Sequence, residues 1–252
     1  GQDGATRMAV ALWGALAAGT VFTAFLLLGT MPADGFLRDP ATGDLLHDDL
    51  VDGAKLRRGK PVAHLKWGNS TTVLVGDFLL ARAMSISAGT EKLKIIRLLA
   101  ELTENMSQGE VHQLMSKGNV ELTERDYLEV IRRKTAMLFE AATESGAILG
   151  DANPQVREAL RVYGRHLGIA FQLVDDALDY AGDTDSMGKN VGDDLTEGKP
   201  TLPLIHALRC GEDAERTLVR NAISEKDNTR INEVLAAIKR CGSLDYTIER
   251  AR

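Results

Sequence analysis

Apolar residues recur at three- and four-residue spacing along three long stretches of the chain, residues 91–117, 125–149 and 155–180. This spacing places them on one face of an α-helix, and none of the stretches alternates as a strand would. The Asn-Pro pair just before the third stretch favours a helix start there. Glycine and aspartate interrupt the pattern over 181–200, and further helices are expected from 201 onward. The fold class predicted is therefore all-α, a helical bundle.

The segment from Met8 to Met31 carries no charged residue, and it is long enough to cross a bilayer as a helix. Glycines at 14, 19 and 29 would equally divide it into two buried helices. Membrane contact through residues 8–31 is the less favoured alternative, because no second apolar run of that length follows. A cleaved signal peptide is not expected, since the segment lacks a small-residue cleavage site.

The chain has 252 residues, of which 44% are hydrophobic and 26% charged. These values are typical of a globular protein, and no shift in composition divides the chain, so one domain is expected over 1–252. The formal net charge of -6 gives no electrostatic reason to expect nucleic acid as a partner. Cys210 and Cys241 are far apart and lack metal-ligand or redox spacing, which fits a reducing compartment, the cytoplasm.

Two short acidic segments share the spacing Asp-Asp-x-x-Asp next to apolar residues of expected helices. The first contains Asp48, Asp49 and Asp52, and the second contains Asp175, Asp176 and Asp179. Each segment can direct two or three carboxylates to one place, because positions i and i+4 of a helix share a face. Carboxylates this close oppose folding unless a cation neutralises them. A single copy would more often be a solvated helix face, but two copies favour a site for Mg²⁺, with Mn²⁺ as the alternative.

Basic residues accompany both acidic segments. They are Arg57 and Arg58 after the first, Lys134 on a middle helix, and Lys189 and Lys199 around the second. Each alone is typical of a soluble surface, but together the guanidinium and ammonium groups could surround a diphosphate. Gln172 could add a neutral donor beside them.

Six segments in this order resemble the trans-isoprenyl diphosphate synthases, especially the polyprenyl branch with octaprenyl-type members. They read LLHDDLVDGAKLRRGKP (45–61), WGNSTTVLVGDFLLARA (67–83), GEVHQL (109–114), RRKTAMLFEAA (132–142), GIAFQLVDDALDYAGD (168–183) and GKNVGDDLTEGKPTLPLIHAL (188–208). The resemblance runs from about Leu45 onward, whereas residues 1–44 are atypical. It implies an isoprenoid-synthase-type bundle with a central cavity.

The resemblance also implies an activity, the magnesium-dependent head-to-tail (1'-4) condensation of isopentenyl diphosphate with an allylic diphosphate such as farnesyl or geranylgeranyl diphosphate. The product would be a longer all-trans prenyl diphosphate for quinone side chains, made by a homodimer. The six aspartates would hold the metal. By the same resemblance Lys134, Gln172, Lys189 and Lys199 would take part in catalysis, and these residues with Arg57, Arg58 and Thr135 would bind the substrates.

Residues 36–44 read FLRDPATGD, where the family usually carries a helix that ends in His-Thr-Ala-Thr. Pro40 and Gly43 disfavour a continuous helix there, and the upstream Gly-Lys-Arg-x-Arg-Pro element of the family is missing. A second hypothesis is therefore a catalytically impaired or non-catalytic partner subunit of a prenyl diphosphate synthase. A third, a class I terpene cyclase, is disfavoured because the second aspartate motif and the paired arginines are intact.

Overall fold

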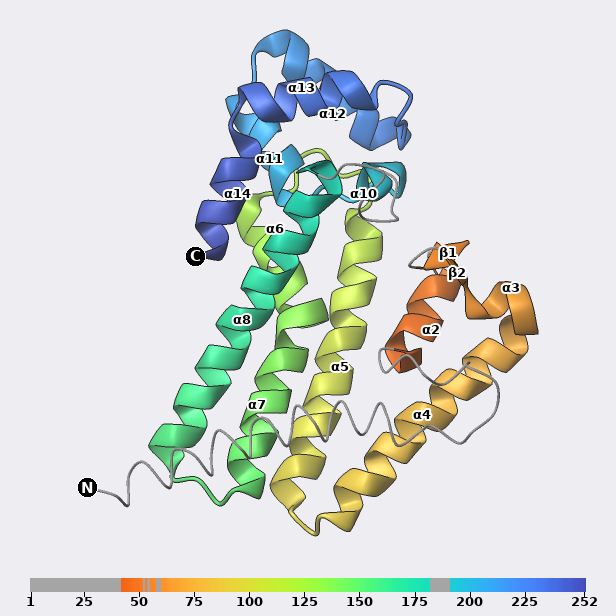
Figure 1. Cartoon of the computed structure of the whole chain (residues 1–252), viewed down its shortest axis with the longest axis vertical. Helices are drawn as coiled ribbons and strands as arrows, with labels where there is room; N and C mark the ends of the chain where they lie inside the picture. The colour runs from red at the N-terminus through yellow and green to blue at the C-terminus, as the bar shows by residue number, and fades with distance from the viewer. Residues whose placement is uncertain (1–41, 52, 54, 58–59, 182–190) are drawn as a thin grey trace. The chain divides into compact units, whose positions relative to one another are not determined.

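The computed structural model describes residues 42–51, 53, 55–57, 60–181 and 191–252 (Figure 1). The chain divides into two compact units, each built from two separate stretches of sequence. Unit 1 comprises residues 1–103 and 139–164, and unit 2 comprises residues 104–138 and 165–252. The prediction of one domain over 1–252 remains a prediction.

Unit 1 contains the first aspartate motif and three helices that follow one another in sequence. α2 (Thr42–Val51) and α3 (Ala63–Trp67) pack against α4 (Asn69–Gly89), and Leu46 of α2 is buried at 3% exposure. Between α2 and α3 a minimal antiparallel ladder pairs β1 (Leu56–Arg57) with β2 (Lys60–Pro61). α2 begins at Thr42 and includes Gly43, so the expectation that Gly43 disfavours a helix is wrong, whereas Pro40 lies outside the described residues.

α2 lies very close to α4 at one point. A Cβ atom at Gly76 would stand 2.3 Å from His47 Nε2, so only glycine allows this approach. The imidazole Nε2 of His47 lies 3.1 Å from the backbone oxygen of Val73, within hydrogen-bond distance. His47 therefore packs between the two helices and fixes the helix that carries the first motif.

The long helices of the remaining chain agree closely with the apolar periodicity. α5 covers Leu93–Ser116, α7 covers Met137–Leu149 and α8 covers Pro154–Ala181. α8 begins as expected at the Asn-Pro pair, where the backbone N–H of Val156 donates to Asn153 Oδ1 at 2.9 Å. In unit 1, Thr143 of α7 donates a hydrogen bond of 2.8 Å to the backbone oxygen of Leu160 in α8.

The expected helix over 125–149 is divided by a π-helical turn. α6 (Glu124–Ile131) leads directly into the turn η1 (Arg132–Ala136), and α7 begins at Met137. The periodicity alone could not reveal this, because a π turn adds residues to a continuous helix without a proline or glycine to mark it. Such turns are frequent at functional sites, and this one contains Lys134 and Thr135.

Unit 2 is completed by short helices after the second motif: α10 (Asp193–Thr196), α11 (Leu202–Cys210), α12 (Asp213–Glu225), α13 (Ile231–Arg240) and α14 (Ser243–Ala251). Fully buried apolar residues from these helices, among them Leu195, Leu204, Ile223 and Ile238, form one core cluster. A second cluster joins α6, α8 and α11 through Tyr127, Ile131, Leu173, Leu202 and Ile205. The all-α prediction is confirmed, with the two-residue ladder as its small exception.

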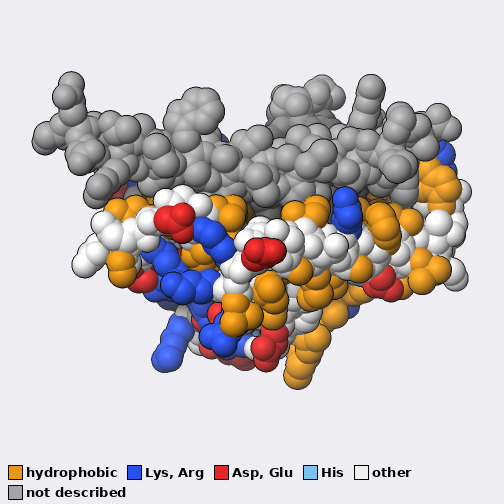
Figure 2. Space-filling model, turned by 90° about the horizontal axis from the view of Figure 1, so that it is seen from below, with side chains coloured by type: hydrophobic (Ala, Val, Ile, Leu, Met, Phe, Trp, Pro, Cys, Tyr) orange, Lys and Arg blue, Asp and Glu red, His pale blue; other side chains and the backbone are white. Residues whose placement is uncertain are grey.

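Exposed apolar side chains are prominent on α4. Leu74 and Phe78 are 67% and 62% exposed. Figure 2, which views the molecule from below, shows further hydrophobic side chains at the surface. Among the described residues, α4 is the one helix long and apolar enough to cross a membrane by length and composition. Of its most apolar window, 22% is buried. α4 contains Asp77 and Arg82, so it is not a second uncharged run like residues 8–31, which lie outside the described part of the chain.

Candidate active site

The second aspartate motif lies near the end of α8, and its three carboxylates have different surroundings. Asp175 is exposed, Asp176 is buried at 3% exposure, and Asp179 is half-buried. Adjacent residues of a helix point about 100° apart, so Asp175 and Asp176 cannot share one environment. The motif therefore presents one carboxylate outward and keeps another inside unit 2.

Asp176 accepts hydrogen bonds on both of its oxygens. The phenol of Tyr127 in α6 donates to Oδ2 at 2.6 Å, and the amide Nε2 of Gln172 donates to Oδ1 at 2.7 Å. Gln172 Oε1 in turn accepts a hydrogen bond of 2.9 Å from the hydroxyl of Thr135 in the π turn. Residues of α6, η1 and α8 are thus joined into one polar chain.

The ionisation of these groups is shifted by burial and by crowding of negative charge. Burial first, then the charge of Asp194 and that of Asp175, raise the pKa of Asp176 to about 8, although the hydrogen bonds from Tyr127 and Gln172 act in the opposite direction. Burial and the nearby Asp176 also raise the pKa of Tyr127 well above its ordinary range. Excess negative charge is concentrated here, as expected of a site that receives a cation.

Asp179 connects the end of α8 to α10. Its backbone oxygen accepts a hydrogen bond of 3.1 Å from the N–H of Gly192, and its carboxylate Oδ2 accepts one of 3.3 Å from the N–H of Asp194. Gly192 has φ 80°, in the left-handed region that glycine occupies without strain. The DD pair at 193–194 is thereby brought next to the second motif.

Two lysines expected to bind substrate are held by glutamates in this structure. Lys134 Nζ lies 2.5 Å from Glu110 Oε2 and donates a hydrogen bond of 2.6 Å to Gln113 Oε1, both on α5. Lys199 Nζ lies 2.5 Å from Glu197 Oε2, and 4.0 Å from an oxygen of Asp194. The ion pairs fix the two ammonium groups in unit 2.

The donor set fits a magnesium ion. Within the described residues, no group of three or more His, Cys, Asp and Glu side chains is placed to hold a metal by itself. Magnesium is usually bound by one or two carboxylates, with water and substrate phosphates as the other ligands, so the exposed Asp175 can serve without such a group. The carboxylates of the second motif and of Asp194 supply the hard oxygen chemistry that this ion selects.

The first motif is described only in part. Asp49 is buried at 6% exposure in α2, and the backbones of Asp48 and Arg57 lie in α2 and β1. Asp52, Arg58 and Lys189 lie outside the described residues. The first motif belongs to unit 1 and the second to unit 2, and a metal site shared by both stays a prediction.

The structure adds residues to the site that periodicity and spacing did not single out. They are Tyr127, Asp194, Glu110, Gln113 and Glu197. Four of these stand in segments already quoted for the resemblance, GEVHQL and GKNVGDDLTEGKPTLPLIHAL, but as acidic or amide residues without special spacing. Tyr127 carried no signal, because one tyrosine in an amphipathic helix is typical of a core residue.

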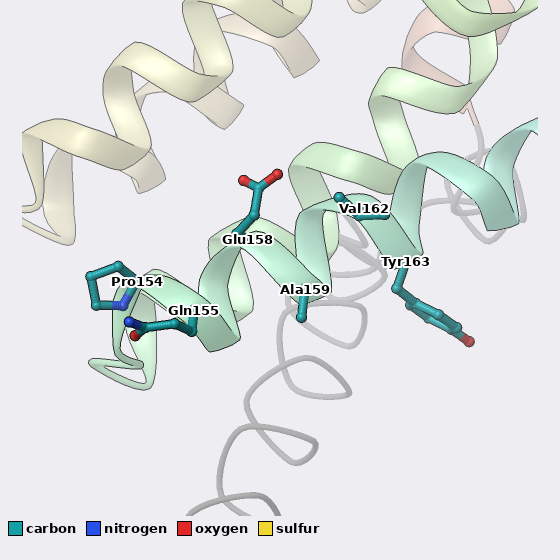
Figure 3. Close-up of a pocket in the computed structure, with 6 residues that line it drawn as sticks. All are labelled: Pro154, Gln155, Glu158, Ala159, Val162 and Tyr163. Atoms are coloured by element: carbon teal, nitrogen blue, oxygen red, sulfur yellow. The ribbon is translucent and has the colours of Figure 1, made fainter.

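A pocket of about 760 Å³ lies elsewhere, along the first turns of α8 in unit 1 (Figure 3). Its lining residues all come from that helix: Pro154, Gln155, Glu158, Ala159, Val162 and Tyr163. None of the residues expected to bind metal or substrate is among them, so this pocket is not the candidate active site.

Comparison with known proteins shows the family and the fold of the chain. The sequence model of the family described as "Polyprenyl synthetase" matches residues 41–241. The octaprenyl diphosphate synthase of Haemophilus influenzae is 48% identical over 212 residues, which cover 84% of this chain and 64% of that protein. The geranyl-diphosphate-specific all-trans-nonaprenyl-diphosphate synthase of Rhodobacter capsulatus is 45% identical over 210 residues, covering 83% of this chain and 64% of that one.

A crystal structure of a polyprenyl synthase from Caulobacter crescentus, in complex with calcium and isoprenyl diphosphate, is similar with a TM-score of 0.81. The two chains are 40% identical, and the similarity covers 98% of this chain and 74% of the other. The fold is therefore that of the all-α polyprenyl synthases. The chain belongs to the polyprenyl synthetase family, and it spans 64% of the length of its Haemophilus influenzae relative.

Proposed function

We propose that the chain is a polyprenyl diphosphate synthase. It would extend an allylic diphosphate, such as farnesyl or geranylgeranyl diphosphate, by head-to-tail (1'-4) condensation with isopentenyl diphosphate. The observation that carries the proposal is the second motif itself, in which an exposed Asp175 stands beside a buried, hydrogen-bonded Asp176 at one end of α8. Family membership supplies the reaction class.

In the proposed reaction the C–O bond of the allylic diphosphate breaks and diphosphate leaves. The double bond of isopentenyl diphosphate attacks the allylic carbon, a C–C bond forms, and loss of a proton restores a double bond. Magnesium, when bound, supplies positive charge that stabilises the leaving diphosphate. Asp48, Asp49, Asp52, Asp175, Asp176 and Asp179 are the residues proposed around it.

The basic residues of this chain would bind and orient the substrates. Lys134 and Lys199 would exchange their glutamate partners for diphosphate oxygens, so that each ammonium group stabilises the charge that accumulates as the C–O bond breaks. Gln172 and Thr135, already joined by a hydrogen bond, would keep the donors of α8 and η1 in place. Arg57 and Lys189 are proposed for the allylic diphosphate and Arg58 for isopentenyl diphosphate.

The product would be an all-trans chain for quinone side chains, made in the cytoplasm. A homodimer is proposed, and the exposed Leu74 and Phe78 on α4 support it as apolar surface that a second copy could cover. Manganese is the proposed substitute for magnesium, because both prefer oxygen ligands.

The test is elongation of farnesyl diphosphate with labelled isopentenyl diphosphate, with and without Mg²⁺, with products resolved by chain length. Asp175→Ala is expected to abolish magnesium-dependent elongation. Asp213→Ala is the matched control, because this aspartate on α12 has a side chain that is 93% exposed and pairs only with a neighbour on its own helix, Arg216, among the contacts described. Failure of the folded wild-type chain to elongate would favour the alternative, a non-catalytic partner subunit.

A further inference from the structure

Tyr127 and Asp176 form a buried polar contact between α6 and α8 in unit 2. They are 4% and 3% exposed, respectively, and the phenol oxygen lies 2.6 Å from Asp176 Oδ2. Both hydrogen bonds to the carboxylate, from Tyr127 and from Gln172, come from neutral donors. A buried carboxylate without such donors would carry a large desolvation cost, so each donor has a strong effect on where the carboxylate can lie.

The tyrosine ring is itself held firmly. It packs in the core cluster with Ile131, Leu173 and Leu202, so its hydroxyl has little freedom to move. The helix that bears it is capped by Thr123, whose hydroxyl accepts a hydrogen bond of 3.2 Å from the N–H of Asp126. Because Tyr127 is held rigidly, its hydroxyl restricts the position of the Asp176 carboxylate that it donates to.

We infer that Tyr127 is a positioning residue for the metal-binding end of α8, where its hydroxyl and the Gln172 amide together hold Asp176 and thereby fix the outward direction of Asp175. The inference rests on the proposed function, because it assigns Asp175 to the metal and diphosphate. Removal of the hydroxyl leaves Asp176 Oδ2 buried without this donor. The carboxylate then rotates or draws in water, and the neighbouring turn of α8 moves with it.

The direct probe is Mn²⁺, added with inorganic diphosphate and followed by the electron paramagnetic resonance signal of the free ion. Tyr127→Phe is expected to weaken diphosphate-dependent Mn²⁺ binding by about tenfold, the usual effect of removing a group that orients a metal ligand. Tyr246→Phe is the matched control. Its hydroxyl donates a hydrogen bond of 2.7 Å to Glu124 Oε2, a contact of the same kind that does not involve the motif.

A double variant distinguishes positioning from a general loss of stability. If Tyr127 acts through Asp176, adding Tyr127→Phe to Asp176→Asn causes no further loss of Mn²⁺ binding. Circular dichroism and thermal unfolding verify the fold of each variant.

Equal Mn²⁺ binding by Tyr127→Phe and Tyr246→Phe would overturn the inference, as would additive losses in the double variant or loss of the helical fold in Tyr127→Phe. No diphosphate-dependent Mn²⁺ binding by the wild-type chain would instead overturn the proposed function on which the inference rests.

Discussion

The backbone nitrogen of Lys134 lies 2.7 Å from the position that a Cβ atom would take at Gly109. The neighbouring Arg133 is almost as close, with its Cβ at 2.9 Å from that position. α5 and the π turn therefore touch backbone to backbone, which only glycine permits. This approach brings Glu110 and Gln113 within reach of the Lys134 ammonium group.

Gly109→Ala is expected to force α5 away from the π turn. The free energy of unfolding should fall by about 1–3 kcal/mol, and elongation activity should fall with it because Lys134 is displaced. Gly89→Ala is the control, since no atom lies within 4 Å of a Cβ at this helix-end position. Its stability should be unchanged or slightly higher. Equal effects of the two substitutions in urea unfolding would contradict the close approach.

Lys134→Met is expected to lower the free energy of unfolding by about 2 kcal/mol, because it leaves Glu110 charged without its partner. The side chains of Lys134 and Glu110 are only 21% and 18% exposed, and Glu110 Oε1 already lacks a hydrogen-bond partner among the described residues. The double variant Lys134→Met with Glu110→Leu should recover much of the loss. Arg230→Met, which breaks an exposed ion pair with Glu233, should have far less effect.

Glu129 gives a pH-dependent contribution to stability. Hydrogen bonds from Arg132, at 2.8 Å, and from Arg133, at 2.6 Å, lower the pKa of Glu129 from 4.5 to about 2, although burial acts against them. A carboxylate with a lowered pKa stabilises the fold above its unfolded pKa and loses this contribution as pH falls through its folded pKa. The stabilisation is therefore present above about pH 4.5 and disappears toward pH 2.

Thermal unfolding at a series of pH values checks this contribution. The Tm difference between the wild type and Glu129→Gln should be modest above pH 4.5, because the ion pair is partly exposed to solvent. It should shrink as the pH is lowered toward 2, because Glu129 becomes protonated. Glu249→Gln, at an exposed pair with Arg252, should keep the wild-type pH dependence. A Tm difference that does not change with pH would rule out the ion pairs as its source.

Magnesium together with inorganic diphosphate is expected to raise the Tm of the wild-type chain, because a ligand bound only by the folded state stabilises it. At 100 times its dissociation constant the effect would be about 2.7 kcal/mol. Asp175→Ala should lose most of the shift, whereas Asp213→Ala should keep it. Addition of EDTA should return the wild-type Tm to its starting value, and a shift that survives EDTA would contradict a metal-dependent site.

Most of the helical framework could be predicted from the sequence, because long amphipathic stretches such as 155–180 determine their own secondary structure. The π turn could not, since its residues RRKTA fit an α-helix equally well. The shared spacing of the aspartates predicted a common face, but it did not reveal that Asp176 is buried while Asp175 is exposed. Asp176 is hydrogen-bonded to Tyr127, which lies 49 positions away in the sequence, so the spacing within the motif could not indicate this partner.

The π turn also sets the angle between two contacts of the site. Tyr127 precedes the turn and reaches Asp176, while Lys134 lies within it and reaches Glu110. Removing one residue between them would rotate one side chain relative to the other by about 100° about the helix axis. The number of residues from 127 to 134 therefore matters as much as their identity. A deletion or insertion in this stretch would therefore disturb both contacts even if Tyr127 and Lys134 themselves were kept.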